Sequence, residues 1–68
     1  KMTANEYTNR IVEASANGEH EKVLAYWGEV MGYNPVTMQY ESELSIEDIV
    51  IVHQGVHSAV ATANKVVS

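Results

Sequence analysis

Apolar and polar positions recur along much of the chain with the period of an amphipathic helix. The first such segment has four apolar residues at helical spacing: Ala4, Tyr7, Ile11 and Ala14. Thr3 and Glu6 form a capping box at its start, because each can bond a backbone amide of the first turn. Asn17 and Gly18 follow, and both tolerate the left-handed conformation that ends many helices. The pattern predicts a first helix over residues 4–16.

A second helical segment ends at Gly32. Glu19 and Glu21 place negative charge in its first turn, where the helix dipole favours it. Its apolar stripe consists of Val23, Leu24, Trp27, Val30 and Met31. Trp27 is expected in the core, whereas its neighbour Tyr26 points away from it and is expected to be an exposed contact residue.

The segment after Gly32 fits two structures. Asn34 can cap a helix and Pro35 suits a first helical position, which predicts a short third helix over residues 35–43. Tyr33 would then pack on Met38. The rival is a strand, because apolar and polar residues alternate over residues 36–40.

The last segment is predicted to be the longest helix, over residues 46–66. Ser45 can cap it, and acidic residues occupy its first turn. One face carries a continuous series that we expect to face the core: Ile46, Ile49, His53, Val56, Val60, Ala63 and Val67. A β-branched run favours a strand over residues 49–53 instead. The helix is preferred, because the periodicity extends well beyond that run.

A second face of this helix lacks the charges of a solvated surface. It carries small or β-branched residues: Val52, Gly55, Ala59, Thr62 and Val66. Small side chains let another backbone come close, so we expect a self-association surface and a homo-oligomer. The alternative is that the other helices of the same chain cover both faces.

These elements predict one all-α domain over residues 1–68, a small bundle of three to four helices with a long C-terminal helix. The alternative is an α+β fold in which residues 36–40 and 49–53 pair as strands. A chain of 68 residues buries only about 60% of its surface, so it is marginal alone. No cysteine is present, which excludes disulfides and leaves helix packing, a metal site or self-association as support.

Charge narrows the choice of partners. The formal net charge is −5, and no Lys or Arg occurs between Lys22 and Lys65. A surface built from that interval would repel phosphates, so nucleic acid is a poor partner. The longest apolar run, residues 23–27, is far below the roughly 20 residues that span a membrane, and we expect a cytoplasmic protein.

The segment from Gly28 to Glu41 resembles a helix-turn-helix in its spacing. Gly28 stands four residues before a turn glycine, Gly32, and the apolar Met38 follows six residues later. The resemblance implies a DNA-binding regulator whose second helix enters the major groove. That helix would carry Gln39 but no basic residue to hold phosphates, so DNA binding is kept only as an alternative function.

His53 and His57 stand four residues apart and can reach one metal ion from one side of a helix. The residues between them do not include the general-base Glu of zinc proteases. Further ligands would have to come from His20, Glu43 or Glu47, and zinc is the metal such a set favours. The preferred interpretation is a packed helix without metal, with His53 facing the core and His57 at its edge.

Catalytic chemistry has little support in the sequence. No serine has a glycine-flanked elbow, no phosphate-binding loop is present, and one small domain offers little room for a substrate pocket. We therefore expect a non-enzymatic module without a cofactor that binds another protein. Short acidic chains of this kind are often regulators or inhibitors of larger proteins, including those encoded by phages and mobile elements.

Overall fold

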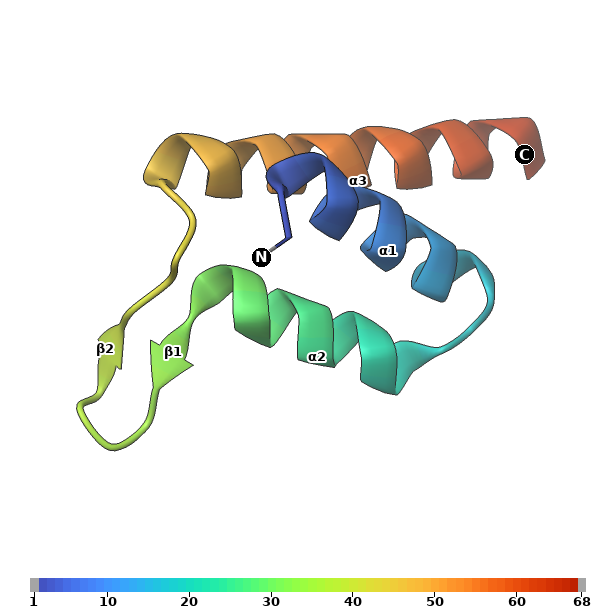
Figure 1. Ribbon diagram of the computed structural model, residues 1–68. Helices are drawn as coiled ribbons and strands as arrows, with labels where there is room; N and C mark the ends of the chain where they lie inside the picture. The colour runs from blue at the N-terminus through green and yellow to red at the C-terminus, as the bar shows by residue number, and fades with distance from the viewer. Residues whose placement is uncertain (1, 68) are drawn as a thin grey trace.

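The structure is a computed structural model that describes residues 2–67, with the side chains of residues 2–63. Within these residues the chain forms helices α1 (Ala4–Ala16), α2 (His20–Met31) and α3 (Ile46–Val67) (Figure 1). A short hairpin of strands β1 (Tyr33–Asn34) and β2 (Gln39–Tyr40) connects α2 to α3. The predicted all-α fold with a long C-terminal helix is confirmed.

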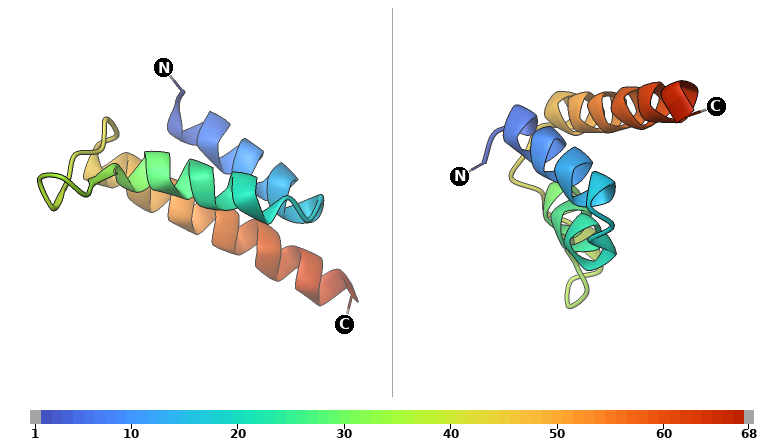
Figure 2. Two further views of the ribbon diagram at one scale, coloured as in Figure 1. Left: turned by 90° about the horizontal axis from the view of Figure 1, so that it is seen from below. Right: turned by 90° about the vertical axis from the view of Figure 1, so that its right-hand side faces the viewer.

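Helix α1 is the centre of the arrangement. It packs against both α2 and α3, and the right-hand view of Figure 2 shows it at the corner where the other two helices meet. The backbone amide of Glu6 donates to the Thr3 hydroxyl at 3.2 Å, so the Thr3 half of the predicted capping box forms. The helix ends at Asn17 and the left-handed Gly18 (φ 72°), as its sequence predicts.

Gly32 ends α2 and fixes the exit of the chain. It adopts a left-handed conformation (φ 63°), and its amide bonds the carbonyl of Gly28 at 2.8 Å. A Cβ atom at Gly32 would overlap the backbone of Ser42. The Ser42 hydroxyl donates to the carbonyl of Val30 and accepts from the amide of Leu44. These contacts hold the segment after the hairpin against the end of α2.

The predicted helix over residues 35–43 is wrong, and so is the alternative pairing of residues 36–40 with 49–53. Tyr33 instead pairs with Tyr40, and Asn34 with Gln39. The Asn34 side chain accepts bonds from two following amides, as a helix cap would, but the chain turns back at Met38. Met38 is left-handed (φ 59°), and its amide bonds the Asn34 carbonyl at 2.8 Å. The same cap therefore starts a hairpin turn.

The core is small. Among the described side chains, one large residue from each helix is fully buried: Ile11, Val30 and Val52. Partly buried residues surround them, namely Ala4, Tyr7, Val23, Tyr26, Trp27, Leu44, Ile49 and Val56. The expectation that Trp27 joins the core is therefore confirmed.

The predicted core face of α3 is rotated from the observed one. Ile49 and Val56 do pack on the core, but Ile46 is 81% exposed, and Val52 is the residue that becomes fully buried. Gly55 lies against Thr8 of α1, so the close approach that small residues permit occurs within one chain. The predicted self-association stripe is wrong at Val52 and Gly55 for this reason.

The other stripe positions differ in their surroundings. Ala59 is half-buried and Thr62 is exposed, while the side chain of Val66 lies outside the described residues. On the predicted core face, Val60 and Ala63 are exposed, and Val67 also lies outside the described side chains. The alternative, that other helices of the same chain cover this face of α3, is therefore correct for the part of α3 that lies beside α1.

Candidate functional site

The paired histidines lie on α3, but their surroundings do not form a metal site. The ring of His53 packs on the ring of Trp27, with centroids 4.5 Å apart, and both histidines are exposed to solvent. No group of three or more His, Cys, Asp or Glu residues within the described part of the chain is arranged to hold a metal ion. The predicted further donors, His20, Glu43 and Glu47, do not converge on the pair. The metal-binding alternative therefore has no support in the geometry.

Tyr26 is not the exposed contact residue that its position predicted. It is half-buried against the core and lies beside Arg10 of α1. A hydrogen bond to Tyr26 raises the pKa of the Arg10 guanidinium above its ordinary value. The residue therefore connects α2 to α1.

The hairpin carries four exposed large apolar side chains on and around its turn. Val36 is 89% exposed and Met38 is 75% exposed, while Tyr33 and Tyr40 stand exposed on the paired strands. The two tyrosine rings lie 5.1 Å apart across the strands. Figure 1 shows the hairpin projecting beyond the end of α2, away from the core. Sequence reasoning missed this surface, because it assigned Met38 to a helix that packs on α2.

Side-chain hydrogen bonds hold the hairpin turn in shape. The Glu41 carboxylate accepts from the Asn34 amide at 3.1 Å and from the Thr37 hydroxyl at 3.0 Å. One carboxylate thus connects both strands and the turn between them. The exposed apolar residues are therefore presented on a fixed loop.

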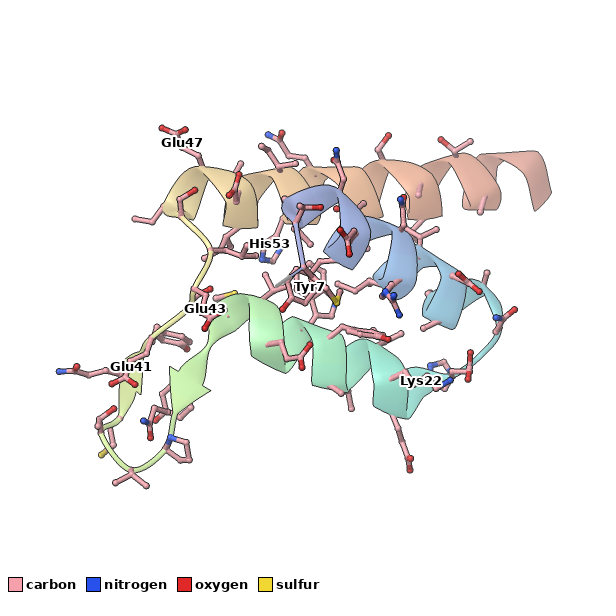
Figure 3. All side chains as sticks on the ribbon, viewed as in Figure 1. Tyr7, Lys22, Glu41, Glu43, Glu47 and His53 are labelled. Carbon is pink, nitrogen blue, oxygen red and sulfur yellow. The ribbon has the colours of Figure 1, made fainter. Side chains whose placement is uncertain are left out.

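An acidic cavity of about 230 Å³ lies where the hairpin joins the helices. It is lined by Met2, Tyr7, Glu29, Glu41, Glu43 and Leu44. Figure 3 shows Tyr7 on α1 and the two glutamates of the loop that leads to α3. Residues from four parts of the chain meet here, and no local pattern in the sequence brings Tyr7 and Glu29 together.

The cavity favours a cation. Burial raises the pKa of the Tyr7 phenol, and the charges of Glu29 and Glu43 raise it further. The phenol therefore stays protonated at neutral pH and can donate a hydrogen bond, but it is not a base. Carboxylates around a space of this size suit the ammonium or guanidinium group of a Lys or Arg side chain.

The segment that resembles a helix-turn-helix does not form one. Its first helix is α2, but residues 33–40 form the hairpin instead of a second helix. DNA binding of this kind needs a recognition helix and basic residues that hold phosphates. The segment has no second helix, and no Lys or Arg occurs between residues 22 and 65.

Comparison of the chain with protein-family models, curated proteins and solved structures found no match. Among the described residues, no helix combines the length and the apolar character needed to cross a membrane.

Proposed function

We propose that this protein is a non-catalytic module that binds another protein by inserting its hairpin into an apolar pocket with a basic rim. The observation that carries the proposal is the projecting hairpin with four exposed apolar side chains: Tyr33, Val36, Met38 and Tyr40. Exposed apolar groups that stand together on a small protein mark interaction sites. Tyr and Met are also enriched at protein interfaces.

The fixed shape of the turn supports this role. The bonds of Glu41 to Asn34 and Thr37 hold the loop before any partner arrives. A loop that is already ordered loses less conformational entropy on binding than a flexible one. A partner would therefore meet the apolar side chains in one arrangement.

Charge indicates the chemistry of the partner. Glu29, Glu41 and Glu43 line the cavity at the base of the hairpin, so a Lys or Arg of the partner can enter it while the tip is bound. Complementary charge speeds association and excludes acidic surfaces. We propose a role as regulator or inhibitor of a larger protein in the cytoplasm, where a cysteine-free chain is well tolerated.

Site-specific photocrosslinking tests the proposal. A photoreactive phenylalanine analogue replaces Val36 in one variant and the exposed Ser15 of α1 in a control. In extract from the source cells, we expect the analogue at position 36 to form a discrete adduct with a basic protein. The adduct should weaken with salt and disappear when Met38 is also replaced by Asp.

Two results would count against this function. The first is the absence of a discrete adduct at position 36. The second is the same set of adducts from positions 36 and 15, since that would reflect collision with abundant proteins.

A further inference from the structure

Helices α2 and α3 each carry a second row of side chains besides those that face α1. The α2 stripe steps by four, three and four residues and consists of His20, Leu24, Trp27 and Met31. The α3 stripe steps by four, three, four and three residues and consists of Ile46, Val50, His53, His57 and Val60. Alternating steps of three and four residues align side chains along one side of a helix, which is the pattern of helices that pair.

The two stripes meet at one corner of the molecule. Trp27 and His53 touch across it, with ring centroids 4.5 Å apart. Figure 3 shows His53 directed from α3 toward α2. Helix α1 packs against both other helices, whereas α2 and α3 have little packing between them. The two stripes therefore meet at the contact between Trp27 and His53 and are not packed together along their length. We call the surface formed by the two stripes the open corner.

The open corner is apolar and largely uncovered. Leu24 is 72% exposed, and Ile46, Val50 and Val60 are exposed as well. Neither stripe contains Asp, Glu, Lys or Arg, and all three histidines of the chain lie on the stripes. A solvated helix face normally carries charges at these positions, so the composition is that of a contact surface.

The chain exposes more surface than a compact monomer of its mass does. The accessible surface is 5182 Å², whereas about 4250 Å² is expected for a compact monomer of 7.5 kDa. The radius of gyration is 12.7 Å, against about 11 Å for a compact domain of this length. The excess of about 900 Å² belongs to the whole chain, the projecting hairpin included, and is of the order of the roughly 800 Å² that each partner loses in a standard interface.

We infer that a second copy of this chain covers the open corner, so that the stripes of two chains form one apolar layer in a two-fold dimer. Each chain has a net charge of −5, and copies would repel one another across most of their surface. The stripes carry no acidic residue, so two copies that meet there avoid direct like-charge contact. A basic partner would find no carboxylate on this surface.

This dimer uses the C-terminal helix, as the sequence predicted, but a different side of it. Val52 and Gly55 face α1, whereas Val50 and His57 face the second copy. The hairpin takes no part, so the dimer is independent of the proposed partner protein.

A pair of matched charge variants tests the inference. Leu24→Glu places a carboxylate in the open corner, and Val36→Glu makes the same kind of change on the hairpin, with both positions exposed. In sedimentation equilibrium, we expect wild type and Val36→Glu to show twice the mass of 7.5 kDa. Leu24→Glu should remain monomeric over the same concentrations, with unchanged circular dichroism.

A cysteine-protection measurement covers the case in which Leu24→Glu fails to fold. The chain has no cysteine, so His57→Cys and Met38→Cys each provide one reactive thiol. Maleimide labelling at position 57 should slow several-fold as the protein is concentrated, while labelling at position 38 should not change. A monomeric wild type, a dimer that only Val36→Glu disrupts, or equal protection at both positions would overturn the inference.

Discussion

At the scale of single residues, Gly32 is the position where the backbone permits no side chain. It is left-handed, and a Cβ atom would overlap the backbone of Ser42. We expect Gly32→Ala to lower the free energy of unfolding by about 1–3 kcal/mol. Gly28→Ala is the matched control in the same helix, because nothing lies within 4 Å of its added Cβ. The control should be neutral or stabilising by up to about 1 kcal/mol in urea unfolding. Equal effects at the two glycines would contradict this assignment.

Gly55 allows α3 to approach α1. An added Cβ would lie 2.7 Å from the Thr8 methyl group, while the Thr8 hydroxyl is bonded to the carbonyl of Ala4 at 2.9 Å. We expect Gly55→Ala to destabilise the fold in the wild-type background but to be tolerated beside Thr8→Ala. The double-mutant cycle should show a coupling of about 0.5–3 kcal/mol. Additive effects would mean that the two positions do not touch.

Local sequence signals correctly predicted the residues that begin and end the helices. Thr3 caps α1, Ser45 bonds the amide of Asp48 at the start of α3, and Gly32 ends α2. Each signal acts through bonds to the nearest few residues, so the sequence contains all the information needed. Asn34 is the exception, because the same side-chain bonds start either a helix or a turn.

At the scale of elements, the hairpin is the part whose shape depends on one side chain. Glu41→Ala removes the acceptor for both Asn34 and Thr37. We expect faster hydrogen exchange at the Met38 amide, which closes the turn, with little change in the helices. Glu21→Ala, an exposed change in α2, is the control and should leave that amide unaffected. If exchange at Met38 stays at the wild-type rate, the carboxylate does not hold the loop.

Hydrophobic periodicity predicted where the helices lie but not which face of α3 packs on α1. It predicted the bounds of α1 and the extent of α3, since a face of 3.6-residue period is a property of the segment itself. It did not predict which side of α3 meets α1, because apolar residues occupy more than one side. Gly55 lies against α1 and Val52 is buried in the core, because the small Gly55 allows the two helices to come close. Ile46 is exposed to solvent as a result.

At the scale of the whole molecule, neither the acidic cavity nor the open corner follows from the sequence alone. The acidic cavity joins Tyr7, Glu29 and Glu43 from separate elements, and the open corner depends on how α2 and α3 sit around α1. Both arise from tertiary packing, which no short window of sequence contains. The charge of the chain was informative at this scale, since the absence of Lys and Arg between Lys22 and Lys65 does not depend on the fold.

The melting temperature of the dimer should depend on protein concentration, because a small core completed by a second copy links folding to association. Only three large described side chains are fully buried within one chain, so burial of the open corner would add a substantial share of the apolar contact. A hundredfold rise in chain concentration should stabilise the dimer by about 2.7 kcal/mol. We therefore expect the melting temperature of wild type and Val36→Glu to rise with concentration. The melting temperature of Leu24→Glu should stay constant, and a wild type whose melting does not depend on concentration would show that one chain is stable without a partner.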